Sequence, residues 1–224
     1  MKVISFSLWG QDPKYLIGAI KNADLAAKIY PDWICRFYVG SSVPSSITSQ
    51  LEQRENTQVV KREEWGNWES MYWRFEPSSE SDVEVVISRD TDSRLSLREK
   101  YAVDQWLESD KGFHIMRDHP WHKYPVLGGM WGSKRGTLPN MKQMIKDFSS
   151  QDAYGTDYVF FAQSVLPTLQ ESDIMVHDPF FSGKPFPRER EGYEFVGKVF
   201  DENDITIEEH EKVLIEFLNN QEKQ

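Results

Sequence analysis

Cysteine is nearly absent from this chain of 224 residues, which contains only Cys35. A single thiol cannot form a disulfide within the chain, and Cys35 lies in a predicted strand, where a small buried residue is more common than a nucleophile. Long apolar runs and a secretory signal peptide are also missing. We therefore expect a soluble, cytoplasmic protein without a membrane span.

Positive charge is in deficit, since 26 Lys and Arg residues stand against 36 Asp and Glu residues. The net charge of −10 argues against nucleic acid or an anionic membrane as the partner. Internal repeats, low-complexity segments and a linker are missing as well. The sequence therefore predicts a single domain that spans residues 1–224.

Strands and helices alternate in the first part of the chain. Short apolar segments rich in β-branched residues predict strands at 2–9, 34–40, 57–62 and 83–87. Asp12 and Pro13 are typical of a helix start, and the apolar residues that follow at three- and four-residue steps predict a helix that ends before Pro31. Shorter helices are predicted at 44–54 and 69–75. This alternation predicts an α/β fold with a mostly parallel central sheet and helices on both faces.

The second half is less regular. A capping box at Ser96–Glu99 predicts the start of a helix, and a second one at Thr206–Glu209 predicts the start of the last helix. Apolar spacing predicts further helices at 140–148 and 157–169. Strands are predicted at 112–116, 125–131 and 174–176. The second of these contains a glycine pair, which predicts a bulge or a close approach of the backbone to a ligand.

The strand at 83–87 leads into the sequence RDTDSR, residues 89–94. In an extended chain, Asp90 and Asp92 point to the same side, so both carboxylates can face one ion. Carboxylate oxygens suit Mn²⁺ or Mg²⁺, and such ions complete their coordination with substrate phosphates, which Arg89 also suits. The alternative is a solvated turn, because Asp, Thr and Ser are common turn residues. The preceding buried strand favours the metal site, since ligands of open α/β sheets bind beyond the carboxyl ends of strands.

Four segments together resemble the GT-A fold of nucleotide-sugar glycosyltransferases, and in particular family 8 enzymes and small stand-alone microbial and viral transferases. They are RDTDSR, the segment MYWRFEP around Arg74, the segment YGTDYVFF, and the segment from His177 to Phe186 that contains Gly183 and Lys184. The resemblance divides the chain into a nucleotide-binding half at 1–95 and an acceptor half with a C-terminal helix at 96–224.

The resemblance implies a metal-dependent glycosyltransferase that uses a nucleotide-sugar donor, with UDP as the expected carrier, and a saccharide or other hydroxyl acceptor. Asp90, Asp92 and His177 would bind Mn²⁺ or Mg²⁺, although His177 and Lys184 are one residue further apart than is usual. Arg74, Gly183 and Lys184 would bind the donor. Asp157 would contact the donor sugar, although Tyr158 stands where the family has glutamine. Retention of the anomeric configuration is slightly favoured.

Positions at predicted strand ends supply the remaining candidates. Donor-binding residues are expected at the ends of the first, third and fourth strands: Ser7, Leu8, Trp9, Gly10, Arg62, Arg89, Asp90 and Thr91. Tyr15, in the first predicted helix, is expected to stack on the nucleotide base or to cover the core. Asp118 follows a strand and is the candidate general base for an inverting reaction. The acceptor side is expected at His119, Trp121, His122 and Trp131. Each also has a structural interpretation: a surface or snorkelling arginine, a helix N-cap at Asp157, a hydrogen-bonded histidine, or an aromatic residue of the core.

Two other functions remain open. A haloacid-dehalogenase-type phosphatase also has an apolar strand that ends in two aspartates, but Arg94 stands where that motif has Thr or Val. Such an enzyme would form a phospho-Asp90 intermediate and need no nucleotide. A non-catalytic nucleotide-sugar binding protein would bind donors without turnover.

Overall fold

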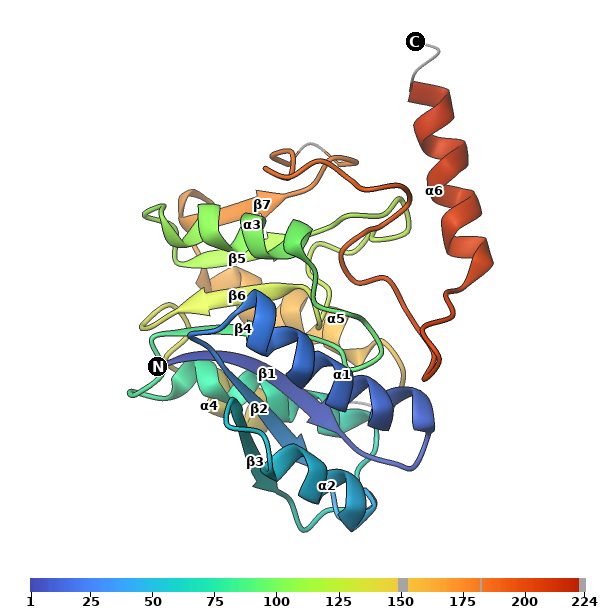
Figure 1. The fold of residues 1–224 in the computed structure, drawn as a ribbon. Helices are drawn as coiled ribbons and strands as arrows, with labels where there is room; N and C mark the ends of the chain where they lie inside the picture. Colours follow the sequence, from blue (N-terminus) through green and yellow to red (C-terminus); the bar gives the residue numbers. More distant parts are fainter. Residues whose placement is uncertain (149–152, 182, 222–224) are drawn as a thin grey trace.

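The computed structural model describes residues 1–148, 153–181 and 183–221. Its strands form one seven-stranded sheet in the order β3-β2-β1-β4-β6-β5-β7 (Figure 1). The four parallel strands of the first half are β1 (Lys2–Leu8), β2 (Ile34–Val39), β3 (Thr57–Lys61) and β4 (Val85–Ser88). β6 (Trp131–Lys134) runs antiparallel to β4 and to β5 (Phe113–Met116), and β7 (Ile174–His177) is parallel to β5. The mostly parallel α/β sheet predicted from the sequence is thereby confirmed.

Helices cover both faces of this sheet, and the central strands β1 and β4 are buried along nearly their whole length. On one face, α1 (Pro13–Ile29), α2 (Ser45–Glu52) and α3 (Leu97–Leu107) pack on one buried cluster that includes Phe6, Phe37 and Trp106. The other face carries the 3₁₀ helix η1 (Trp68–Ser79), α4 (Met141–Asp147), α5 (Thr156–Phe160) and the π-helical turn η2 (Phe161–Val165). The helices on both faces were also predicted correctly.

An aromatic cluster fixes η1 against the sheet. The ring of Phe75 lies within 5.3–6.1 Å of the rings of Tyr72, Trp131, Phe160 and Phe161, measured between centroids. Aromatic pairs of this kind contribute about 0.5–1.5 kcal/mol each beyond the burial of their surface. The cluster therefore holds the residue next to Phe75, which is Arg74, in a defined place.

Two predicted elements are wrong in the second half. The predicted strand at 125–131 is a loop, and β6 begins only at Trp131, because the glycine pair Gly128–Gly129 forms a turn. The predicted helix at 157–169 is divided into α5, η2 and the 3₁₀ turn η3 (Leu166–Thr168). Pro167 cannot donate the next helical hydrogen bond, which accounts for the end of this segment. A further 3₁₀ turn, η4 (Glu171–Asp173), leads into β7.

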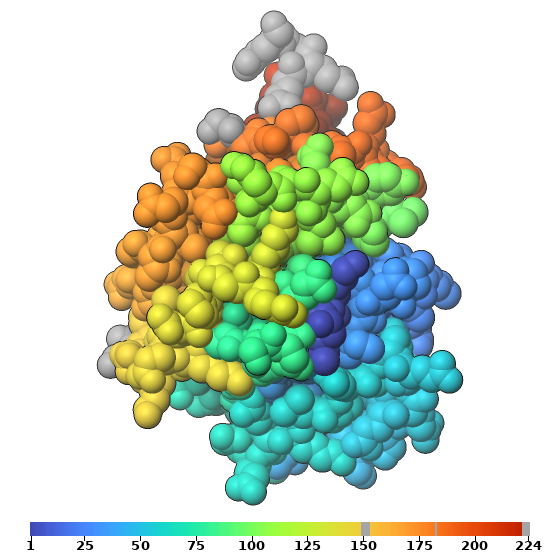
Figure 2. All heavy atoms as spheres, turned by 90° about the vertical axis from the view of Figure 1, so that its left-hand side faces the viewer, coloured from blue at the N-terminus to red at the C-terminus, as the bar shows by residue number. Residues whose placement is uncertain are grey.

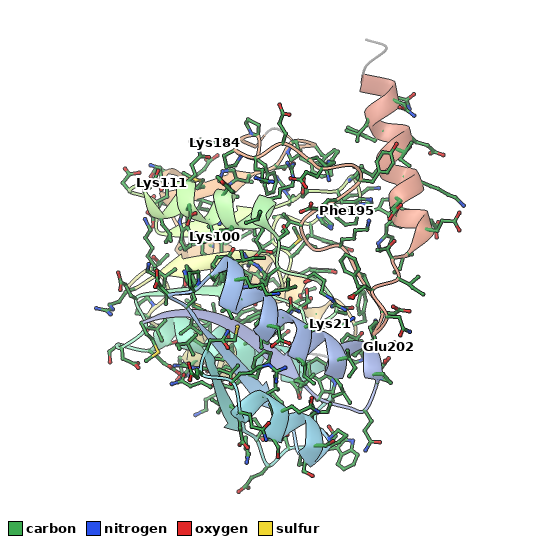
Figure 3. All side chains as sticks on the ribbon, in the orientation of Figure 1. Lys21, Lys100, Lys111, Lys184, Phe195 and Glu202 are labelled. Atoms are coloured by element: carbon green, nitrogen blue, oxygen red, sulfur yellow. The ribbon has the colours of Figure 1, made fainter. Side chains whose placement is uncertain are left out.

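The last part of the chain returns to the first half. Residues 195–206, here called the C-terminal strap, run from the β7 side of the molecule to α1, and α6 (Glu208–Gln221) follows (Figures 1 and 3). Lys21 of α1 donates to the carbonyl of Glu202 at 2.8 Å and pairs with Asp204 at 2.6 Å. Asp204 also pairs with Arg94, and the amide of Phe200 donates to the carbonyl of Asp92 at 2.8 Å. The strap thus contacts the loop that follows β4.

The start of the chain is enclosed by later segments. Seen from the side where β1 begins, the first residues lie between a blue segment of the early chain and a green segment further along the sequence (Figure 2). The amino group of Met1 donates to the carbonyl of Asp82, and the carbonyl of Met1 accepts from the amide of Glu84. Among the residues that the structure describes, no helix has both the length and the apolar character needed to span a bilayer.

Candidate functional site

A cleft of about 530 Å³ opens where the carboxyl ends of β1 and β4 meet. Parallel neighbours end at the same edge of a sheet, so the residues after both strands face this space. Thirteen of the residues predicted for the site line the cleft: Ser7, Leu8, Trp9, Gly10, Tyr15, Arg74, Asp90, Thr91, Asp92, His119, Trp121, His122 and Asp157.

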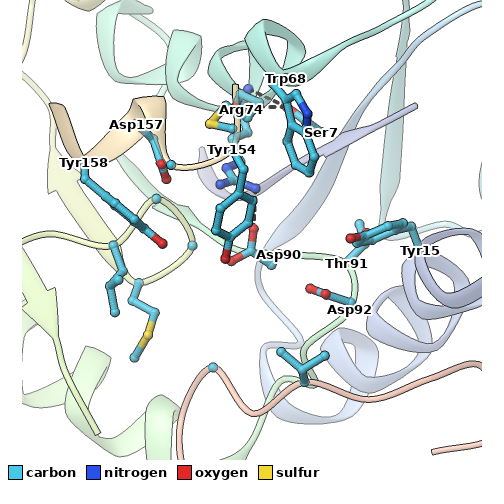
Figure 4. A pocket seen from close by; sticks show the side chains of 18 of the residues that line it. Ser7, Tyr15, Trp68, Arg74, Asp90, Thr91, Asp92, Tyr154, Asp157 and Tyr158 are labelled. Carbon is cyan, nitrogen blue, oxygen red and sulfur yellow. Dashed lines mark hydrogen bonds and ion pairs between the residues drawn. The ribbon is translucent and has the colours of Figure 1, made fainter. Parts of the chain in front are cut away.

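The two aspartates after β4 form the acidic centre of the cleft (Figure 4). Burial raises the pKa of Asp92, and the negative charge of Asp90 raises it further, while Lys14 opposes both effects. Asp90 pairs with Arg74 at 2.5 Å, and Asp92 pairs with Lys14 at 3.3 Å. A buried carboxylate with a second negative charge beside it is an environment that a cation would stabilise.

A buried asparagine holds this loop in shape. Asn22 on α1 donates to the carbonyls of Thr91 and Ser93 at 3.2 and 2.8 Å, and it accepts from the amide of Leu95 at 3.0 Å. Gly18, one turn earlier, lets the helix approach closely, because a Cβ there would lie 2.0 Å from the carbonyl oxygen of Thr91. The turn between the two aspartates is therefore fixed by α1.

Ser7 at the end of β1 positions Arg74. Its hydroxyl donates to the carbonyl of Met71 and accepts from the amide of Arg74, at 3.2 and 3.1 Å. The guanidinium then reaches Asp90, as the dashed lines in Figure 4 show. The structural alternative of a surface arginine does not apply, because Arg74 is buried and lines the cleft.

Asp157 lies across the cleft from Asp92, in the first turn of α5 (Figure 4). Burial raises its pKa, Arg74 lowers it and Asp90 raises it again. The glycine pair before β6 makes this arrangement sterically feasible. A Cβ at Gly128 would lie 2.1 Å from Oδ2 of Asp157, and a Cβ at Gly129 would lie 1.9 Å from Oδ2 of Asp90. The close approach predicted at these glycines is therefore made to the cleft carboxylates.

Three predicted residues lie outside the cleft, within the packed interior. Asp118 is fully buried and pairs with Arg98 and Arg190 at 2.7 Å, so a general-base role is not supported. Arg89 is buried and pairs with Glu99 at 2.9 Å. Because the Glu99 carboxylate is engaged by Arg89, the capping box predicted for α3 is not completed. Trp131 is fully buried in the aromatic cluster around Phe75, which excludes the acceptor contact expected of it.

The predicted third metal ligand, His177, also lies away from the aspartates. Its two ring nitrogens bond to His114 and Gln105, both at 2.7 Å, so neither is free for a metal ion. Burial first, and then the charges of Lys184 and Arg98, lower the pKa of His177 to about 4. The sheet order explains this placement, because β6 and β5 separate β7 from β4.

The remaining predicted donor ligands, Gly183, Lys184 and Arg62, also lie outside the cleft. Gly183 and Lys184 lie beside β7, where Lys184 bonds back to the strand through its backbone (Figure 3). Ser182, within the same motif, lies outside the described residues. Arg62 pairs with Glu76 at 2.7 Å and stacks on Tyr38, outside the cleft.

Several lining residues were not predicted as site residues. They come from loops, from the strap and from single positions in η1, α5 and α6, where no pattern of the sequence marks them: Gln11, Asp12, Trp68, Met71, Tyr124, Leu127, Met130, Tyr154, Gly155, Tyr158, Phe195, Gly197, Val199 and His210. An excess of aromatic residues beside predicted loops was the available signal for this group.

A scan of family models and a search of curated proteins each find no match for the sequence. Solved structures do match. A glycosyltransferase involved in the glycosylation of the major capsid of PBCV-1 is 14% identical, with 80% of this chain and 81% of that chain covered and a TM-score of 0.53. The mannosyltransferase PcManGT from Pyrobaculum calidifontis, in complex with GDP-Man and Mn²⁺, is 11% identical, with 80% and 55% covered and a TM-score of 0.54.

A third match is the 4-diphosphocytidyl-2C-methyl-D-erythritol synthase from Anaerococcus prevotii. It is 10% identical, with 97% of each chain covered and a TM-score of 0.55. At such low identities the matches show the fold and nothing further. The chain has the GT-A fold of nucleotide-sugar glycosyltransferases, as the sequence resemblance predicted.

Proposed function

We propose that the protein is a metal-dependent glycosyltransferase that moves a sugar from a nucleoside-diphosphate donor to an acceptor hydroxyl. The observation that carries this proposal is the pair of Asp90 and Asp92 in the cleft at the end of the central strand β4. The GT-A fold supports it, and UDP is the expected carrier nucleotide. The acceptor would be a saccharide or another molecule with a free hydroxyl.

Asp90 and Asp92 would hold Mn²⁺ or Mg²⁺. Hard oxygen ligands suit both ions, which commonly keep water and substrate phosphates in their remaining positions. The chemistry of the two carboxylates fits that arrangement, because burial and the charge of Asp90 raise the pKa of Asp92, and a bound cation would relieve this repulsion. When bound, the ion would neutralise charge on the departing nucleoside diphosphate.

The other cleft residues would divide between binding and chemistry. Ser7 to Gly10 and Tyr15 would contact the nucleotide, and Arg74 would turn from Asp90 to the donor. Asp157 would orient the hydroxyls of the donor sugar. The acceptor oxygen forms the new bond to the anomeric carbon as the bond to the diphosphate breaks, and the acceptor proton must leave. Since Asp118 is buried in ion pairs, Asp157, whose pKa is raised by burial, is the better candidate base for inversion.

Nucleotidyl transfer is a second candidate, because the synthase from Anaerococcus prevotii covers nearly the whole chain. A nucleotidyltransferase joins the nucleoside monophosphate unit of a nucleoside triphosphate to the phosphate of its acceptor and releases pyrophosphate, so the phosphates of both substrates would enter the cleft. Among the described lining residues, Arg74 is the only lysine or arginine. This composition favours glycosyl transfer over nucleotidyl transfer.

The test uses the purified protein with a panel of UDP- and GDP-sugars and Mn²⁺. We expect one donor to release nucleoside diphosphate, and EDTA to stop the release. Asp92→Asn should abolish turnover with the fold intact, whereas Asp110→Asn, at an exposed position outside the cleft, should retain it. Turnover by Asp92→Asn at the wild-type rate would refute the metal role.

The same purified protein, given further substrates, separates the alternatives. A nucleotidyltransferase would instead release pyrophosphate from CTP or UTP. A phosphatase would hydrolyse p-nitrophenyl phosphate without a nucleotide, through a phospho-Asp90 intermediate. A binding protein would bind donors with no turnover of any of them. The anomeric configuration of the product, measured by NMR, distinguishes retention from inversion.

A further inference from the structure

The cleft is divided by charge into two halves. Asp90, Asp92 and Arg74 lie in the half next to the carboxyl ends of β1 and β4. The other half of the cleft, called the acceptor half from here on, is lined by residues of the loop at 119–130, of the segment at 154–158, and of parts of the strap and of α6. Among the described residues that line this acceptor half, Asp157 is the only carboxylate, and there is neither a lysine nor an arginine.

Three histidines line the acceptor half, and their burial favours the neutral imidazole. Burial lowers the pKa values of His119, His122 and His210, and for His122 the value falls to about 3. A phosphorylated or otherwise anionic acceptor would therefore meet no lysine or arginine among the residues that line this half, and the nearby Arg190 and Lys198 already pair with Asp118 and Glu211. Desolvating such a group without a counter-charge is costly, so the charge distribution selects against it.

Exposed aromatic rings line the same half. The exposed fraction is 42% for Trp121, 51% for Tyr124 and 76% for Tyr154. Tyr124 stacks on Tyr158 with ring centroids 4.0 Å apart, and Trp121 meets His210 edge to face at 5.4 Å. Each ring is thus held in place by a neighbour and is still open to solvent. Rigid amphipathic rings of this kind offer apolar surface for the C–H face of a sugar ring at low entropic cost.

The polar groups of this half suit hydroxyl groups. Nδ1 of His122 accepts from the backbone amide of Asp118, so the ring proton is on Nε2, where it can donate into the cleft. Asp157 supplies an acceptor, and the tyrosine hydroxyls can do both. A hydroxyl also donates and accepts, so this combination fits a polyol rather than an apolar chain.

We propose that the acceptor half binds an uncharged carbohydrate, whose ring lies against Trp121 and Tyr124 while His122 donates to one of its hydroxyls. This assignment rests on the proposed function and names the class of its acceptor. It excludes sugar phosphates and lipid-linked diphosphates as acceptors that lie in this half.

The test measures saturation-transfer NMR on the wild-type protein with UDP and Mg²⁺, because Mn²⁺ is paramagnetic. The probes are the methyl glycosides of glucose, galactose and mannose, lactose and maltose, compared with glucose 6-phosphate and glucuronic acid. We expect the ring protons of at least one uncharged probe to receive saturation, with weaker transfer to the two anionic probes. Stronger transfer to an anionic probe would overturn the assignment.

Variants locate the binding. Trp121→Ala and Tyr124→Ala should each weaken the affinity for the uncharged probe by about three- to tenfold, from the usual contribution of an aromatic contact. Tyr101→Ala is the matched control, because Tyr101 is similarly exposed, at 48%, on α3 outside the cleft. Unchanged affinity in both cleft variants, or an equal loss in the control, would overturn the assignment.

UDP binding is measured in parallel by calorimetry. If the protein binds UDP with Mg²⁺ but none of the uncharged probes, the acceptor assignment fails alone. If the protein binds no nucleoside diphosphate at all, the proposed function fails and the acceptor assignment with it.

Discussion

Gly129→Ala is the most informative single substitution, because it adds one methyl group where Asp90 leaves no space. The new Cβ would lie 1.9 Å from Oδ2 and 2.5 Å from Cγ of Asp90. Ordinary contact is about 3.5 Å, so the carboxylate must retreat by about 1.5 Å. The Asp90 side chain is 44% exposed and can swing away, so we expect a loss of only about 1 kcal/mol in the free energy of unfolding.

The effect on activity should be much larger. A displacement of about 1 Å in an active site can lower the rate by about 100-fold. We expect a loss of that size in kcat/KM for nucleoside diphosphate release, together with a weaker apparent affinity for Mn²⁺. Both are measured by coupled assay at a series of Mn²⁺ concentrations, with thermal unfolding as the check on the fold.

Gly128→Ala is the matched control, with the same methyl group one residue earlier. Its Cβ would lie 2.1 Å from Oδ2 of Asp157 and 2.7 Å from Nη2 of Arg74. This variant should lose turnover while its Mn²⁺ affinity stays close to wild type. If Gly129→Ala keeps both turnover and Mn²⁺ affinity, Asp90 has no role in the reaction, and the metal site is refuted.

Three further predictions concern stability. Asn22→Ala leaves two carbonyls and one amide without partners and should lower the free energy of unfolding by about 2–3 kcal/mol in urea titrations; an unchanged midpoint would contradict the anchoring role. Asp118→Asn removes the buried carboxylate from Arg98 and should destabilise by about 3 kcal/mol. The folded variant should still turn over normally, and a loss of 100-fold or more would restore Asp118 as the base. His177 and His114 are buried and have lowered pKa values, so the unfolded state binds more protons than the native state below pH 6.5. These histidines should contribute no change above that pH, and His177 alone should lower the stability by about 3 kcal/mol as the pH falls to 4, which urea titrations at several pH values would test.

The first half of the chain was predictable because its strands are apolar, short and separated by helices with clear ends. Those patterns determine which residues follow a strand, and parallel pairing then brings the ends of β1 and β4 together. Asp90, Asp92 and Ser7 could be placed in one site for this reason. Arg74 depended on the resemblance, since a helical arginine between aromatic residues carries no signal of its own.

The errors came from sheet order and from loops. His177 follows a strand, as predicted, but a sequence does not state which strands become neighbours, and two other strands lie between β7 and β4. Asp118 follows β5, and its environment of two arginines comes from distant segments. The glycine pair was recognised as a place of close approach, but its conformation depends on the carboxylates that it faces.

The contact between the strap and the Asp92 loop has a consequence for how the protein is made. The amide of Phe200 and the carboxylate of Asp204 anchor a loop that was synthesised about a hundred residues earlier. Asp204 is the only non-glycine residue with a positive φ in the described part of the chain, so this anchor depends on a strained turn. During translation the nucleotide-binding half can form its sheet early, but its acidic loop gains these contacts only after residue 204 has left the ribosome. A nascent chain halted before that point should therefore be folded in large part and still lack a completed site.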